Sequence, residues 1–200
     1  MDERKSVREK AETNDTAAAF GGTEAEDYVG RLAGFLMNWQ LEAQEEGRVP
    51  DLCRDIFREA GGIRIPPVSE RFSEWQEESY ATALWLLRGE MKLTIPDSPE
   101  KVRAYIERLD EIRRTEPAVR EGLIEFFDRE SSNLICYRRF LPGGRDAAGE
   151  IVAMCNLGGR MEHVHTPYDI VSYTGMLGNY ENRYDRKELR PFECIVMKHR

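Results

Sequence analysis

The sequence predicts an α+β protein, in which a helical first half packs on an antiparallel β-sandwich formed by the second half. Three segments before residue 117 carry apolar residues at steps of three and four, the spacing of an amphipathic helix with one apolar stripe. Beyond Pro117 the pattern changes to short β-type runs, separated by turn residues such as Pro142-Gly143-Gly144. Several short strands at this spacing are typical of a sandwich or a barrel.

Helix-terminal signals place the three helices. The first is expected over 23–47, with Thr23 as its N-cap and Gly47 as its stop. The second is expected over 73–87. The third begins at Ser98-Pro99, where a serine N-cap followed by proline at the first helical position fits the fixed φ of proline. Shorter elements are expected between these helices: a helix at 52–57 and strands at 63–65 and 90–95.

The chain divides into three predicted parts. Residues 1–22 alternate charged with small residues and offer little apolar surface to bury, which predicts a disordered leader. Residues 23–117 form the helical part and residues 118–200 the β part. The strands expected in the β part are 123–127, 134–140, 151–157, 170–173, 176–180 and 192–197.

The charge balance is acidic, with 37 Asp and Glu against 29 Lys and Arg. A protein that neutralises phosphates normally shows a basic face, so nucleic acid and anionic membranes are not expected as partners. The sequence contains neither an apolar run of membrane-spanning length nor a secretory signal at Met1, which predicts a cytoplasmic protein. Its four cysteines lack CxxC spacing and are expected to be free thiols packed as small hydrophobes.

A run of motifs in the second half resembles a known family. Residues 98–122, SPEKVRAYIERLDEIRRTEPAVREG, resemble the last barrel helix of α-glucosidases and oligo-1,6-glucosidases, which belong to the α-amylase family, glycoside hydrolase family 13. Four later segments resemble successive strands of that family's C-terminal β domain, namely 133–139, 151–157, 177–180 and 188–194. Three earlier segments resemble elements around the seventh and eighth barrel strands, namely 36–40, 68–72 and 81–89.

This resemblance implies that 23–117 is a small helical remnant of a (β/α)8 barrel and that 118–200 is an α-amylase-type C-terminal β domain. The family's nucleophilic Asp and acid/base Glu would lie before Met1. Its third carboxylate should sit about four residues before Val68, where the chain reads Gly62-Ile63-Arg64-Ile65-Pro66-Pro67. Retaining hydrolysis needs two closely spaced carboxyls, so neither a catalytic residue nor a cofactor is expected.

Three function classes remain open. The first is a non-catalytic accessory or interaction module, with a second copy or another protein covering the open barrel face. The second is the C-terminal part of a split α-glucosidase that works only with a partner chain. The third is a sugar-binding module that takes an oligosaccharide, for which Tyr168, Tyr173 and Tyr180 are candidate stacking residues. His163 and His165 would share one face of a strand, but no third ligand is evident, so no metal site is expected.

Overall fold

The computed structural model describes residues 22–51, 65–66, 68–89, 98–143, 149–181 and 187–200. The predicted leader, the helix at 52–57 and the strand at 90–95 lie outside these residues, as does most of the strand at 63–65. The helices are α2 (Gly22–Glu45), α4 (Glu70–Trp85), α5 (Glu100–Thr115) and α6 (Pro117–Glu121). The strands are β1 (Leu123–Phe127), β2 (Leu134–Phe140), β3 (Ile151–Asn156), β4 (Glu162–His163), β5 (Tyr173–Gly178), β6 (Glu188–Leu189) and β7 (Cys194–His199).

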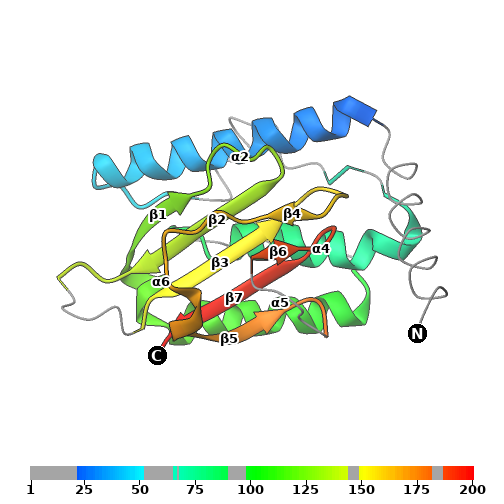
Figure 1. Cartoon of the computed structure of the whole chain (residues 1–200). Coiled ribbons are helices and arrows are strands. Elements are labelled where there is room, and N and C mark those ends of the chain that lie inside the picture. The colour runs from blue at the N-terminus through cyan, green and yellow to red at the C-terminus, as the bar shows by residue number, and fades with distance from the viewer. Residues whose placement is uncertain (1–21, 52–64, 67, 90–97, 144–148, 182–186) are drawn as a thin grey trace.

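Five strands form one antiparallel sheet in the order β1-β2-β3-β7-β5. The helices cover one face of it: α4 packs on β3 and β7, α5 packs beside α4, and α2 lies along β1 (Figure 1). This face and the helices share one large apolar core. The predicted α+β fold, with a small helical part packed on an antiparallel sheet, is thereby confirmed.

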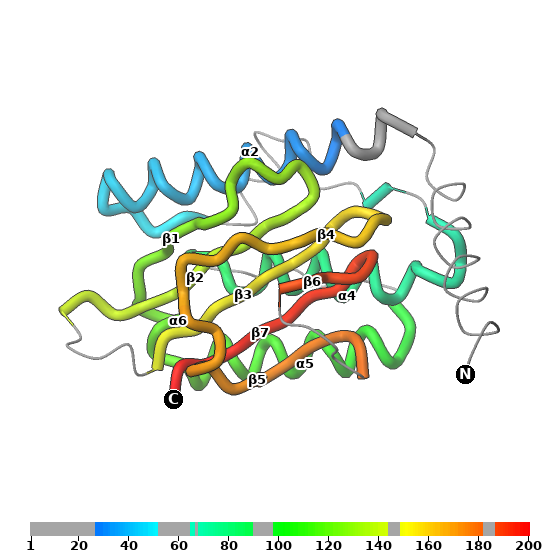
Figure 2. The backbone as a smooth tube through the Cα atoms, viewed as in Figure 1, coloured from blue at the N-terminus to red at the C-terminus, as the bar shows by residue number. Residues whose placement is uncertain are grey.

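The opposite face of the sheet has its own smaller core. From β3 the chain passes through β4 and runs back across this face to the start of β5 (Figure 2). There β4 and β6 pair as a separate two-stranded sheet. The second layer of the β part is therefore this small sheet together with irregular chain. Among the described residues, no helix has the length and apolar character needed to cross a membrane.

Several predicted boundaries hold, and the end of α2 has a clear physical reason. Strands β1 and β2 have the predicted limits. Helix α2 ends at Glu45, and Gly47 follows with φ +68°. The Gly47 N–H donates to the Gln44 carbonyl and the Arg48 N–H to the Ala43 carbonyl, the paired bonds of a Schellman C-cap. Glycine is needed here because its backbone adopts the left-handed region without a steric penalty.

Other boundaries were wrong. Helix α5 begins at Glu100 with Pro99 as the N-cap residue, and the Ser98 hydroxyl donates to Glu77 on α4 and does not cap the helix. The predicted strand at 170–173 is a 3-10 turn (Ile170–Ser172), because the Asp169 carboxylate accepts the Val171 N–H. The strands predicted at 170–173 and 176–180 are therefore replaced by the single strand β5.

Two glutamines one turn apart on α2 tie this helix to distant backbone. The Gln44 side-chain amide donates to the Ile124 carbonyl (3.1 Å) and accepts the Ile124 N–H (2.7 Å) on the edge strand β1. Gln40 makes the same pair of bonds with the Arg88 carbonyl (3.0 Å) and N–H (2.9 Å). Each amide therefore satisfies both polar groups of one residue, as a neighbouring strand would.

Truncating Gln44 to alanine should lower the free energy of unfolding by about 1–3 kcal/mol, because both polar backbone groups of Ile124 lose their partner. Urea unfolding followed by circular dichroism measures the change. Glu45→Ala, at an exposed neighbouring position of α2, is the matched control and should change stability by less than about 0.5 kcal/mol. Equal effects of the two substitutions would contradict the proposed role of the amide.

Candidate functional site

Two of the three predicted tyrosines lie in one polar cluster on the outer face of the sheet. We call Glu125, Arg138, Glu150, Tyr168 and Tyr173 the outer cluster. The Arg138 guanidinium lies 2.6 Å from the Glu125 carboxylate and 3.2 Å from that of Glu150. It also lies over the Tyr168 ring, 5.0 Å from the centroid, and the Tyr173 hydroxyl donates to Glu150 at 3.2 Å.

Burial raises the pKa of both Tyr168 and Tyr173 to about 12, so both phenols are neutral hydrogen-bond donors at neutral pH. Tyr173 is 3% exposed, and its ring packs edge-on against His199. The Tyr168 ring is half-buried and packs edge-on against Phe127. The structure therefore brings these two residues together, although their rings are occupied by neighbouring side chains.

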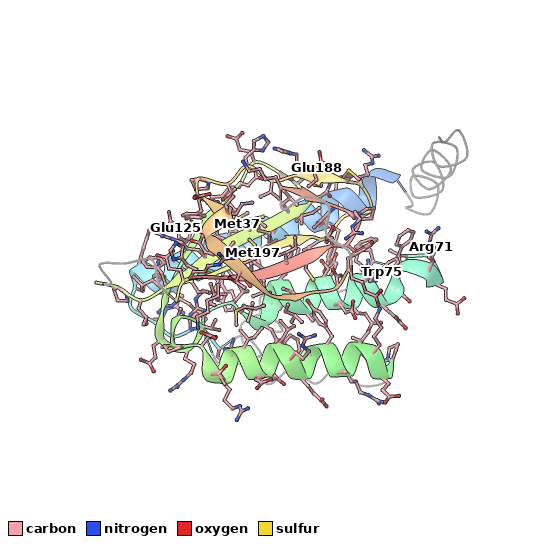
Figure 3. The ribbon with its side chains drawn as sticks, turned by 60° about the horizontal axis from the view of Figure 1, so that its bottom comes forward. Met37, Arg71, Trp75, Glu125, Glu188 and Met197 are labelled. Atoms are coloured by element: carbon pink, nitrogen blue, oxygen red, sulfur yellow. The ribbon has the colours of Figure 1, made fainter. Side chains whose placement is uncertain are left out.

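Tyr180 lies elsewhere, at the N-terminal end of α4. Its ring stacks on Trp75, with centroids 4.7 Å apart, and the Arg190 guanidinium lies 3.9 Å from the centroid. Its hydroxyl donates to the Pro191 carbonyl at 2.8 Å. Glu125 of the outer cluster and Trp75 lie towards opposite ends of the molecule (Figure 3). The three tyrosines thus do not form one platform, and their role in sugar binding stays a prediction.

The histidine pair lies on the outer face as well. The rings of His163 and His165 are 5.0 Å apart, and the His165 backbone N–H donates to the Asp128 carboxylate at 2.8 Å. Across the described ranges, no three or more His, Cys, Asp or Glu side chains are grouped so that they could hold a metal ion.

Glu78 is a buried ionisable residue that the sequence did not reveal. Its side chain is 1% exposed in the middle of α4, and its Oε2 atom has no hydrogen-bond partner. Lys101 of α5 lies 4.0 Å from the Glu78 carboxylate and 3.3 Å from that of Glu74. Burial raises the pKa of Glu78 to about 7; the Lys101 charge opposes this rise, and the charges of Glu74 and Glu77 add to it.

Raised carboxyl pKa values are typical of general acids in enzymes. The Glu78 side chain, however, is closed off from solvent, so a substrate cannot reach it. Nothing in the sequence distinguishes Glu78, because Glu77-Glu78 looks like an ordinary charged pair near a helix start. Burial here depends on α5 and β7 packing against this turn of α4.

Glu78 predicts a specific pH dependence of stability. Its pKa in the folded protein, about 7, is above the ordinary value of 4.5, so between these pH values folding takes up a proton. This contribution to stability is complete below pH 4.5 and is lost as the pH rises to about 7. In Glu78→Gln this decrease of stability with rising pH should be absent. Relative to wild type, the variant should therefore be more stable at pH 8 than at pH 5.

Urea midpoints at pH 5 and pH 8 test this expectation. The matched control is Glu107→Gln, at an exposed position of α5 whose charge is not among those that shift the pKa of Glu78, and it should keep the wild-type pH dependence. An unchanged difference between the two pH values in Glu78→Gln would show that this carboxyl does not titrate as described.

The described helices and sheet have the fold of part of the enzymes of glycoside hydrolase family 13, which is a likeness of fold alone. The sequence-based resemblance to the C-terminal part of these enzymes is thereby confirmed as a likeness of fold. One solved structure that it resembles is trehalose-6-phosphate hydrolase from Bacillus licheniformis, with a TM-score of 0.59 and 13% identity over 84% of this chain and 46% of that one. A mutant of the same hydrolase gives a TM-score of 0.58.

A mutant isomaltulose synthase from Erwinia rhapontici NX5 also matches, with a TM-score of 0.41 and 20% identity over 52% of this chain and 19% of that one. Neither a protein-family model nor a curated protein sequence matches the chain. The chain thus spans less than half the length of the structures that it resembles.

Proposed function

We propose that this chain is a non-catalytic accessory or interaction module derived from the α-glucosidase lineage. The observation that supports this proposal most is the enclosure of α4. Every residue from Glu78 to Leu87 is buried, and this helix shares one apolar core with α2, α5 and the sheet. In a complete (β/α)8 barrel the helices form an outer ring. Here a helix of that origin lies inside, as expected of a module that closes its own core.

Two pairs of carboxylates among the described residues favour the same view. Glu125 and Glu150 share the Arg138 guanidinium, and Glu74 and Glu78 share the Lys101 ammonium. A retaining glycosidase holds its two carboxyls across the scissile bond, with nothing between them but substrate. Because a cation lies between the two carboxylates of each pair, these carboxylates are suited to holding strands and helices together.

A split α-glucosidase would need an apolar rim on the helical part to receive the missing barrel strands. The large hydrophobic side chains exposed in the described helical part are Val49 and Ile65, which lie outside the helices. The sugar-binding alternative would be favoured by exposed coplanar tyrosines, whereas the rings of Tyr173 and Tyr180 are covered. We therefore rank both below the accessory module, and we place the module in the cytoplasm, in keeping with its buried free thiols.

The test is an assay of the purified chain on p-nitrophenyl α-glucoside and isomaltose, beside a calorimetric titration with maltose. The accessory module is expected to turn over neither substrate and to bind no maltose. Turnover by the chain alone would refute the proposal, and maltose binding without turnover would replace it with the sugar-binding module. Light scattering of the same sample shows whether a second copy is the partner.

A further inference from the structure

Two cysteines of the core face each other across neighbouring strands. Cys155 on β3 and Cys194 on β7 are partners in the register of this antiparallel pair. The next residue along β3, Asn156, donates its N–H to the Glu193 carbonyl at 2.9 Å. The Cys194 N–H turns away from β3 and donates to Asn179 Oδ1 at 2.9 Å. Because hydrogen-bonded and non-hydrogen-bonded pairs alternate along an antiparallel ladder, Cys155 and Cys194 form a non-hydrogen-bonded pair.

This register brings the two thiols close together. The Cα atoms of a non-hydrogen-bonded pair lie about 4.5 Å apart, and the two side chains project from the same face of the sheet. Disulfides join Cα atoms that are about 4.4–6.8 Å apart, so a bond between Cys155 and Cys194 needs no large movement of the backbone. Both residues are free thiols in the structure, and both belong to the apolar core that the sheet shares with the helices.

Cys136 provides an internal comparison. It lies on β2 opposite Met154, and it belongs to the smaller core on the other face of the sheet. Because the sheet separates the two cores, Cys136 cannot bond to Cys155 or Cys194 while the strands stay paired. Among the described residues, therefore, the fold prepares one pair of cysteines for a disulfide.

Cys194 also contacts the helices. Its Sγ atom lies 3.2 Å from the Thr82 hydroxyl oxygen of α4 and 3.1 Å from the Tyr105 hydroxyl oxygen of α5. Burial raises the pKa of Cys194 to about 12, and the hydrogen bonds with these two hydroxyls oppose the rise. The thiol is therefore protonated at neutral pH, and its oxidation should be slow. Since the two hydroxyls can stabilise a thiolate, we expect Cys194 to react before Cys155.

We propose that Cys155 and Cys194 are a modification site, at which hydrogen peroxide converts two thiols into a cross-strand disulfide between β3 and β7. The Cys194 thiolate attacks one peroxide oxygen, the O–O bond breaks, hydroxide leaves and the sulfur becomes a sulfenic acid. The Cys155 thiolate then attacks this sulfur, the S–O bond breaks and a second hydroxide leaves. The two hydroxides take up the two thiol protons, so two thiols and one peroxide give one disulfide and two water molecules.

Peroxide is suited to this site because it is little larger than water. It can reach enclosed thiols through the small local openings of a folded protein, without global unfolding. The proposal concerns the core of the chain and does not rest on its function as an accessory module.

Peptide mapping of the whole chain by mass spectrometry, after hours in hydrogen peroxide without denaturant, tests the proposal. The peptide that contains Cys155 should be joined to the peptide that contains Cys194, and dithiothreitol should separate them. The bond should form in Cys136→Ala as in wild type and should be absent in Cys155→Ala. If an alanine variant does not fold, the wild-type map alone decides. The absence of the joined peptide, or bonds spread over all four cysteines, would overturn the proposal.

The urea midpoint of the oxidised chain, measured before and after dithiothreitol, tests whether the bond fits the native register. A disulfide that closes the loop from 155 to 194 without strain should raise the midpoint by roughly 1 M before reduction. Dithiothreitol leaves oxidised methionines unchanged, so the comparison isolates the bond. A lower midpoint before reduction than after it would contradict the proposal, because the strands would then have to move to accept the bond. Neither result depends on turnover or maltose binding, so the two proposals fail separately.

Discussion

Replacing Arg139 by methionine should lower the free energy of unfolding by about 3–5 kcal/mol, because several enclosed carbonyls lose their charged donor at once. The Arg139 side chain is enclosed between the sheet and the helices, and it donates to four carbonyls. The acceptors are Leu86 at 2.6 Å, Val119 at 2.6 Å, Gly122 at 3.0 Å and Leu123 at 3.2 Å. Methionine fills the space but leaves all four oxygens without this donor. Since domains are typically stable by about 5–15 kcal/mol, this loss is a large share of the total stability.

Urea unfolding followed by circular dichroism measures this cost, and Arg138→Met is the matched control. Arg138 precedes Arg139 on β2 but points to the outer face, where it pairs with the carboxylates of Glu125 and Glu150. Two partly exposed pairs contribute about 2 kcal/mol or less together, so the loss should be clearly smaller than in Arg139→Met. Equal losses in the two variants would show that the enclosed network around Arg139 does not hold the helices to the sheet.

The second large effect is expected from Gly89→Ala. The new Cβ atom would lie 2.1 Å from the Pro50 carbonyl oxygen, and the backbone at this position has φ +119°. Backbone strain of about 1–3 kcal/mol and overpacking of about 1–3 kcal/mol add to a loss of about 2–6 kcal/mol. The urea midpoint should fall accordingly. An unchanged midpoint in Gly89→Ala would show that Pro50 does not approach the turn after α4 as closely as described.

Gly34→Ala is the control for this substitution. Gly34 lies within α2, and a Cβ atom there would meet no atom within 4 Å beyond the helix's own backbone. Alanine is favoured over glycine inside a helix by about 0.5–1 kcal/mol, so this variant should be slightly more stable than wild type. If Gly89→Ala lowers the free energy of unfolding and Gly34→Ala raises it, the loss at Gly89 comes from the surroundings of that residue and not from the change of residue type.

The sequence predicted those elements whose signals are local. Strands β1 and β2 are flanked by turn residues, and Gly47 terminates α2 by its own backbone preference. By contrast, Ser98 has the chemistry of an N-cap but bonds to Glu77, a partner supplied by tertiary packing. The small sheet of β4 and β6 was not predicted, because two-residue strands carry no periodicity of their own.

Side-chain surroundings were less predictable than the fold. Tyr180 looked like a candidate for stacking on a sugar, but its ring stacks on Trp75, more than a hundred residues earlier in the chain. In the sequence Glu78 looked like its neighbour Glu77. In the structure the packing of α5 and β7 buries Glu78. Arg139 could have been found, since Ile135, Tyr137 and Arg139 alternate onto the same buried face of β2.

We propose that the helices and the sheet form one module that folds without a partner. Hydrogen exchange of the purified chain, measured peptide by peptide in increasing urea, tests it most directly. The buried helix α4 and the central strands β3 and β7 should lose protection together, in one cooperative transition. Loss of protection in α4 at urea concentrations that leave β3 and β7 fully protected would contradict the claim, because the helical part would then need something else to cover it.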